Sequence, residues 1–213
     1  MTLQVQAEKL EVAAGESVLL PETSFTLQAP GLIALTGPNG AGKTTLLKTL
    51  AGRQLPSSGQ CLIGNLTAYE FDPAFRAAVA SLIDTPPMAR DMTLNEQLML
   101  VRLSWGDDDD EARFGAEQCL ARLTIPHLGD RFPYELSSGQ LQLFALALTL
   151  SRPFEVLLLD EPERHLDAER VVALLDVLDQ HVDRGALIIT ATHRQEIIDR
   201  NTHRIHLVRD AGS

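Results

Sequence analysis

Residues 37–45 read Gly-Pro-Asn-Gly-Ala-Gly-Lys-Thr-Thr and fit the phosphate-loop (Walker A) pattern G-x-x-x-x-G-K-[ST] in full. The apolar run 31–37 predicts a buried strand before the loop, and residues 43–50 predict a helix after it. Glycines let backbone N–H groups wrap phosphate oxygens, and Lys43 would neutralise the β- and γ-phosphates of a nucleotide. The Thr44 hydroxyl would bind Mg²⁺. A glycine-rich turn with a chance lysine is the alternative, but strand, loop and helix all favour a nucleotide site.

Two carboxylates follow a second apolar run, at residues 156–160. They stand at the carboxyl end of a predicted strand, where open α/β sheets place their ligands. Asp160 is expected to hold Mg²⁺ through water. Glu161 is expected either to accept a proton from an attacking water or to orient that water. A solvated acidic turn is the alternative. His193 ends the next apolar run and could hydrogen-bond a γ-phosphate, although a histidine at a strand end is more often structural.

Residues 135–140, Glu-Leu-Ser-Ser-Gly-Gln, precede a long apolar stretch and predict a helix start. Free N–H groups and the positive end of the helix dipole can bind an anion there, yet the segment contains no lysine. Taken alone, the pattern would be only a helix cap.

The rest of the chain predicts an α/β fold: a largely parallel sheet with an antiparallel β edge and a helical insertion. We expect one domain, 1–213, with a catalytic core of 1–85 and 146–213 and an insertion at 86–145. The net charge is −11, which argues against nucleic-acid binding, and no signal peptide or membrane helix is apparent. Two cysteines without a close-spaced motif favour a reducing compartment. Predicted strands are 3–12, 24–29, 31–37, 154–160, 185–193 and 203–208, and predicted helices are 43–50, 73–83, 93–103, 110–123 and 167–181.

The phosphate loop, LSSGQ, LLLDEP, HLD and TH, in this order, resemble the ATP-binding cassette (ABC) ATPases over about residues 3–208. In that family two cassettes pair head to tail, and the LSGGQ-type helix start of one caps the γ-phosphate held by the other. The resemblance therefore implies that Ser137, Gly139 and Gln140 serve ATP in trans, and that Glu161 and His193 are catalytic. The residues it implies for ATP binding in cis are Gly37, Asn39, Gly40, Ala41, Gly42, Lys43, Thr44 and Thr45.

Three departures from the family pattern stand out. Asp84 occupies the usual position of a glutamine, and we expect its carboxylate to bind Mg²⁺ or water. Ala14 stands where an aromatic residue usually stacks on adenine, so base discrimination is expected to be weaker. Arg164 and His165 are bulkier than the residues usual after the two carboxylates.

The resemblance implies an ATP-hydrolysing subunit that energises a transporter, with ATP and Mg²⁺ as cofactors. Its partners would be a second cassette and membrane-spanning permeases, and it would bind no nucleic acid. It would be located at the cytoplasmic face of the cell membrane. We lean slightly towards export. The alternatives are a non-transport ABC ATPase driving cytosolic assembly and a structural cassette in a heterodimer.

Overall fold

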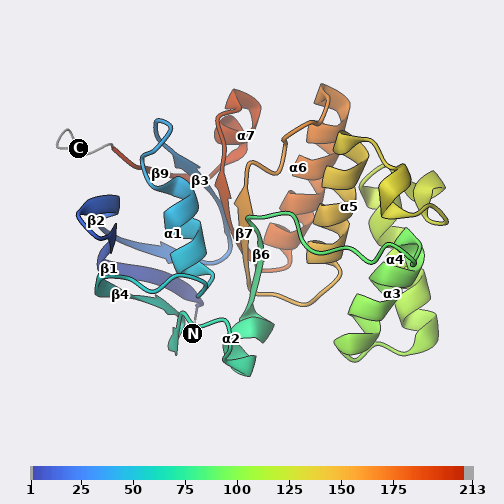
Figure 1. The fold of residues 1–213 in the computed structure, drawn as a ribbon, viewed down its shortest axis with the longest axis horizontal. Helices are drawn as coiled ribbons and strands as arrows, with labels where there is room; N and C mark the ends of the chain where they lie inside the picture. The colour runs from blue at the N-terminus through green and yellow to red at the C-terminus, as the bar shows by residue number, and fades with distance from the viewer. Residues whose placement is uncertain (1, 209–213) are drawn as a thin grey trace. The chain divides into compact units, whose positions relative to one another are not determined.

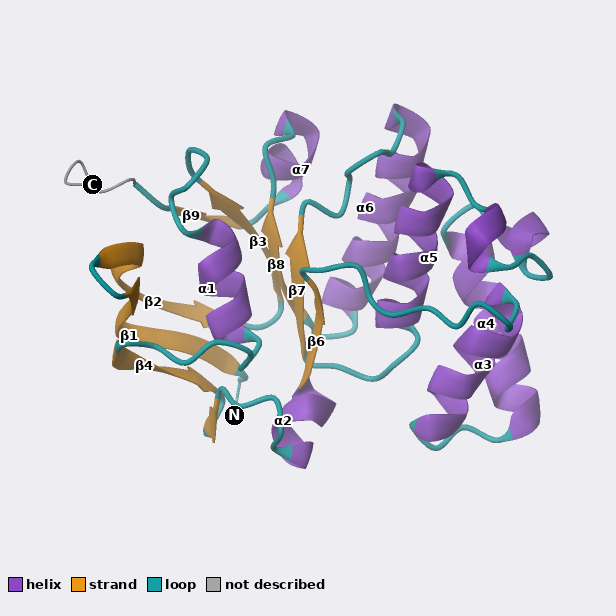
Figure 2. Ribbon diagram, viewed as in Figure 1, coloured by secondary structure: helices purple, strands orange, loops and turns teal. Residues whose placement is uncertain are grey.

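The phosphate-loop motif follows the carboxyl end of β3, an inner strand of a five-stranded parallel sheet with the order β6-β7-β8-β3-β9 (Figures 1 and 2). All four strand pairings in this sheet are parallel. Every residue of β3 and β8 is buried, as expected of strands covered on both faces. The predicted α/β fold is confirmed. The strands are β3 (Gly31–Thr36), β6 (Val79–Leu82), β7 (Val156–Asp160), β8 (Leu187–Ala191) and β9 (His203–His206).

A second, antiparallel sheet has the order β2-β1-β4-β5. β1 and β2 form a hairpin that closes where Ala14 pairs with Ser17. This sheet is the predicted antiparallel β edge, although β4 and β5 were not predicted. The strands are β1 (Gln4–Ala14), β2 (Ser17–Gln28), β4 (Ser58–Ile63) and β5 (Leu66–Thr67).

The structure, a computed structural model, describes residues 2–208, which group into two compact units. The first unit contains the chain up to Ile83, Phe154–Glu161 and the chain from His181 onward. Its core joins apolar residues of both sheets to α1, whose Leu46, Leu47 and Leu50 are fully buried. The helices of this unit are α1 (Lys43–Leu50), α2 (Pro73–Ala78) and α7 (Gln195–Arg200).

The second unit contains Asp84–Pro153 and Pro162–Gln180 and is helical. Reciprocal capping boxes start three of its helices, each made by Thr, Asp or Ser with a Glu or Gln three residues later. The apolar helix α5 packs inside the unit, and α3 and α4 lie side by side (Figure 1). The elements are α3 (Leu94–Ser104), α4 (Asp109–Arg122), η1 (Pro126–Leu128), η2 (Pro133–Glu135), α5 (Ser138–Leu150) and most of α6 (Ala168–Asp183).

Three details of the sequence interpretation were wrong. Residues 73–83 do not form one helix, because α2 ends at Ala78 and the chain continues as β6 along β7. Sheet pairing outweighs the local helical pattern there. The acidic run at 107–111 indicates a solvated loop by its composition, yet Asp108 caps α4 and the last three residues of the run form its first turn. Phe114 and Leu120 indicate the core of the helical insertion; Leu120 is buried as expected, whereas Phe114 is 65% exposed.

No helix within residues 2–208 combines the length and the apolar character needed to span a bilayer. The predicted insertion at 86–145 stays a prediction, and the second compact unit has different bounds.

Candidate functional site

The phosphate loop joins β3 to α1, as the sequence predicts. Gly40 and Gly42 have φ angles of 80° and 93°, a left-handed region that glycine adopts without steric cost. The Lys43 side chain folds back over the loop, where its Nζ donates to the carbonyl oxygens of Gly37 at 2.8 Å and Pro38 at 3.2 Å. Only 8% of Lys43 is exposed. The loop therefore holds its one cationic side chain against two of its own carbonyl oxygens.

The other predicted loop residues differ in exposure. Asn39 and Gly40 are exposed, Ala41 is buried, and Thr45 is half-buried. The Thr45 carbonyl accepts a bond from the Thr49 hydroxyl one helical turn later. The tip of the loop is thus exposed to solvent, whereas its last residue, Thr45, is held by a hydrogen bond within α1.

Thr44 and Asp160 meet although they are far apart in the sequence. The Thr44 hydroxyl donates to the Asp160 Oδ2 at 2.6 Å. A hydroxyl and a carboxylate are hard oxygen ligands of the kind that Mg²⁺ prefers, usually together with water and substrate phosphate. Within residues 2–208, no group of three His, Cys, Asp or Glu side chains could hold a metal alone. The pair therefore fits a cation that is also bound by nucleotide phosphate.

Glu161 follows Asp160 in a left-handed conformation, with a φ of 46°. Such a conformation is uncommon for a residue with a side chain, and its strain often marks a functional site. Its N–H donates to the Ala191 carbonyl at 2.9 Å, which ties Glu161 to the end of β8. His193 comes two residues after β8 and is exposed. β8 lies between β7 and β3, so the phosphate loop, Glu161 and His193 all follow carboxyl ends at one edge of the sheet.

In the helical unit, Ser137 is the N-cap of α5. The Gln140 N–H donates to the Ser137 Oγ at 3.3 Å, and the Ser137 N–H donates to the Gln140 Oε1 at 2.9 Å. The hydroxyl proton of Ser137 stays available, because Oγ acts here as an acceptor. The N–H groups of Ser138 and Gly139 lie in the first turn, where a helix provides no acceptor of its own. This end of α5 can thus donate to an anion.

The loop after the carboxylates packs against the start of α5. A Cβ added at Gly139 would lie 2.7 Å from the His165 carbonyl oxygen, so only glycine fits there. Gln142 donates from Nε2 to the Pro162 carbonyl at 3.1 Å. Sequence reasoning missed Gln142, although a lone amide in an apolar helix was a usable signal. Asp167 accepts a bond from the Arg170 N–H and so caps the first turn of α6.

A family profile described as "ABC transporter" matches residues 20–164, more than half of the chain. The Fe(3+) ions import ATP-binding protein FbpC 1 of Rhizobium meliloti is 35% identical over 93% of this chain and 56% of its own length. The spermidine/putrescine import ATP-binding protein PotA of Nitrosospira multiformis is 33% identical over 90% of this chain and 53% of its own. The chain belongs to the ABC transporter family.

A solved structure of similar fold is the ATP-binding cassette MJ0796, a dimer in a post-hydrolysis state bound to ADP and Pi. It superposes with a TM-score of 0.85 at 21% identity, covering 95% of this chain and 94% of that one. This similarity concerns the fold. The chain spans about half the length of the curated relatives it matches.

The departures of this ABC cassette from its family pattern are all at exposed positions. Ala14 ends β1 at the tip of the hairpin, and Asp84 follows β6 in a bend. Arg164 and His165 are exposed, and His165 has a left-handed φ of 64°. The metal-binding role of Asp84 stays a prediction.

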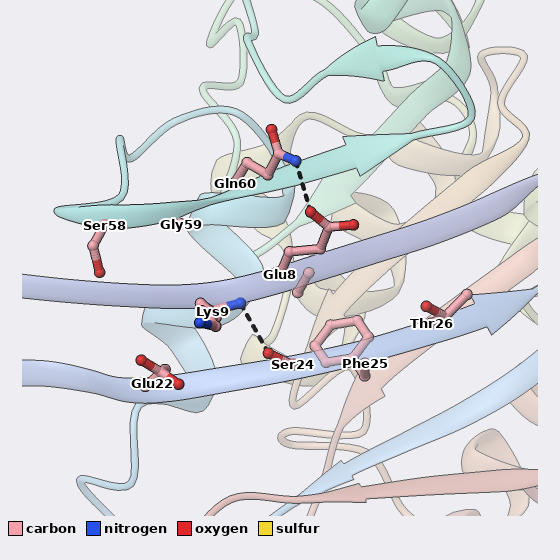
Figure 3. A pocket seen from close by; sticks show the side chains of 10 residues that line it. Glu8, Lys9, Glu22, Ser24, Phe25, Thr26, Ser58, Gly59 and Gln60 are labelled. Atoms are coloured by element: carbon pink, nitrogen blue, oxygen red, sulfur yellow. Dashed lines mark hydrogen bonds between the residues drawn. The ribbon is translucent and has the colours of Figure 1, made fainter.

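The cassette also has a groove of about 870 Å³ on its antiparallel sheet, shown in Figure 3. Lys9 bulges from β1 there, with a φ of 46°, and its N–H donates to the Ser24 hydroxyl. None of the predicted ATP-site residues lines this groove, so it is separate from the phosphate loop. The lining residues are Ala7, Glu8, Lys9, Glu22, Ser24, Phe25, Thr26, Ser58, Gly59 and Gln60.

Proposed function

We propose that this cassette binds ATP with Mg²⁺ and hydrolyses it to energise a transporter. The observation that carries the proposal is the bond between Thr44 and Asp160, which joins the phosphate loop to the carboxylate strand. Glu161 and His193 follow strands at the same edge of the sheet. A phosphate site, a cation site and a candidate base therefore belong to one sheet edge.

Each residue has a chemical role in this proposal. Lys43 leaves the loop carbonyls that it now contacts and neutralises the β- and γ-phosphates. Thr44 and Asp160, with Asp84 as a further candidate, hold Mg²⁺, which supplies charge neutralisation for the phosphates. Glu161 orients the attacking water and accepts its proton, and His193 hydrogen-bonds the γ-phosphate.

We further propose that the active form is a dimer in which each γ-phosphate is bound by residues of both cassettes. Ser137 would donate its hydroxyl, and Gly139 its N–H, to the nucleotide of a second cassette, while Gln140 keeps the turn in shape. Support comes from the capping box, which occupies the Ser137 lone pair and spares its proton. A helix start with small residues approaches an anion closely.

The transport partners are proposed from the relatives. FbpC 1 and PotA are both named import proteins, so the expected lean towards export has no support, and we propose import. The cassette would then attach to permease subunits at the cytoplasmic face of the membrane.

Steady-state ATP hydrolysis by the purified protein tests the enzymatic proposal. We expect turnover that needs Mg²⁺ and falls by about a thousandfold in Glu161→Gln, because general bases contribute about 10²- to 10⁴-fold. Wild-type turnover no higher than that of Glu161→Gln would refute it. Co-purification with a multi-span membrane protein tests the transport proposal, and binding to soluble partners alone would contradict it.

A further inference from the structure

Thr36, the last residue of β3, is only 3% exposed, and its hydroxyl lies within hydrogen-bond distance of three groups of β9. β9 pairs with β3 in parallel, with Arg204 opposite Ala34 and His206 opposite Thr36. The Arg204 Nε donates to the Thr36 Oγ1 at 2.8 Å. Thr36 Oγ1 also lies 3.2 Å from the Ile205 carbonyl and 3.0 Å from the His206 Nδ1. One buried hydroxyl thus contacts three groups of β9.

The hydrogen-bonding capacity of this hydroxyl explains why an arginine suits the position. A threonine hydroxyl has one proton and two lone pairs. The proton can serve Ile205 or a neutral His206, so a lone pair needs a donor of its own. The Arg204 Nε–H is a permanently charged donor, and charge-assisted bonds are roughly twice as strong as neutral ones.

The chain after β9 also closes on the first residue of the phosphate loop. Leu207 donates its N–H to the Thr36 carbonyl at 2.8 Å. A Cβ at Gly37 would lie 2.5 Å from the Leu207 carbonyl oxygen, and Gly37 has a φ of 147°. The Gly37 carbonyl in turn accepts the bond from Lys43. A continuous set of contacts therefore runs from β9 through Thr36 and Gly37 to the loop lysine.

We propose that Arg204 is a positioning residue for the phosphate loop: by fixing the Thr36 side chain, it sets the start of the loop and the carbonyl that Lys43 contacts. The inference rests on the proposed ATP binding for its functional consequence, and on contacts within the first unit for its structure. Within residues 2–208, Arg204 takes part in no ion pair, so its bond to Thr36 is not a by-product of a surface salt bridge.

The test uses two variants and their combination. Arg204→Met keeps the unbranched stem of the side chain up to about the position of Nε and removes the donor, and Thr36→Val keeps the shape and removes the hydroxyl. We expect Arg204→Met to raise the Kd for ATP by about 3- to 10-fold, the effect of one lost hydrogen bond. Thr36→Val should raise the Kd at least as much, because it also removes the contacts of the hydroxyl with Ile205 and His206. Because Thr36→Val already removes the bond to Arg204, the double variant should bind ATP no more weakly than Thr36→Val alone. Thr36→Ser should bind as the wild type does.

Hydrogen exchange provides a readout that needs no nucleotide. In the nucleotide-free protein, amides 37–45 should exchange faster in Arg204→Met, while those of α2 stay unchanged. Arg76→Met, at an exposed arginine of α2, is the matched control and should alter neither exchange at 37–45 nor the Kd.

Two results would overturn the inference: unchanged exchange and Kd in Arg204→Met, or additive effects in the double variant. Wild-type protein that binds no ATP would instead refute the proposed function, and exchange would still decide the role of Arg204.

Discussion

Ser137→Asp separates the two roles of Ser137, as a helix cap and as a donor to phosphate. Aspartate caps a helix about as well as serine, and its charge suits the positive end of the helix dipole. It can accept the bond that Ser137 Oγ now accepts from the Gln140 N–H. Aspartate has no proton to donate, however, and it would place a negative charge where a γ-phosphate is expected. Folding should therefore survive while pairing through ATP fails.

The magnitudes differ enough to be measured. Ser137→Ala removes the cap and should cost about 1 kcal/mol of stability. For a domain of this size, that lowers Tm by about 2–4 °C. Ser137→Asp should leave Tm within about 1 °C of the wild type. Two unit charges about 4 Å apart repel by about 4 kcal/mol at an effective dielectric constant of about 20. At about 1.4 kcal/mol for each factor of ten, the dimer Kd should rise by about a thousandfold for each shared site.

Sedimentation velocity with ATP and Mg²⁺ measures the pairing, in a Glu161→Gln background that slows hydrolysis, and thermal unfolding measures the cap. The expected pattern is an ATP-dependent dimer for the Glu161→Gln parent and only monomer when Ser137→Asp is added. ATP binding to the monomer should be unchanged. A Ser137→Asp protein that dimerised with ATP as well as its parent would refute the trans role. An unchanged Tm in Ser137→Ala would refute the cap.

Three further predictions concern other parts of the chain. Thr44→Val removes the hydroxyl that contacts Asp160, and losing a hydrogen bond to a charged group costs about 1.5–3 kcal/mol. The Mg²⁺ concentration that gives half-maximal hydrolysis should therefore rise at least about tenfold in Thr44→Val and stay unchanged in Thr44→Ser. Ala14→Tyr should raise ATP affinity several-fold in calorimetric titrations, because stacking on a base contributes about 1–3 kcal/mol, and an unchanged Kd would contradict the assigned base position. Glu96 and Glu135 each accept a backbone N–H bond from the residue three positions earlier, which together with a side-chain hydrogen bond holds the pKa below the usual 4.5. Since their folded-state pKa is lowered, the stability they contribute is present above pH 4.5 and is lost as the pH falls. The free energy of unfolding of the double variant Glu96→Gln, Glu135→Gln should therefore fall less steeply with acid than that of the wild type, as measured by urea unfolding at a series of acidic pH values.

Local patterns predicted the elements whose physics is local. The helix at 43–50 follows a glycine-rich loop and begins and ends as expected. The start of α5 could be predicted because Ser137 and Gln140 satisfy each other within one turn. The buried strands β3, β7 and β8 are continuous apolar runs, which parallel sheets require.

Elements that depend on distant partners were missed or misassigned. Residues 79–82 carry a helical pattern, yet they form β6 because they pair with β7, whose residues lie 77 positions later along the chain (156 − 79). β4 has exposed polar residues over its first half and becomes a strand by pairing with β1. The local sequence of neither segment predicts the strand with which it pairs.

The candidate site divides in the same way. Its chemical groups are visible in the sequence, because phosphate and Mg²⁺ chemistry needs particular residue types at fixed spacing. Their support is not visible: Thr36 and Arg204 are 168 positions apart, and Thr44 and Asp160 are 116 apart. A motif thus specifies what a loop can bind, whereas strands folded against it from the far end of the chain specify its shape. Residues such as Arg204, outside every motif, are therefore where variation between cassettes should alter nucleotide affinity without altering the chemistry.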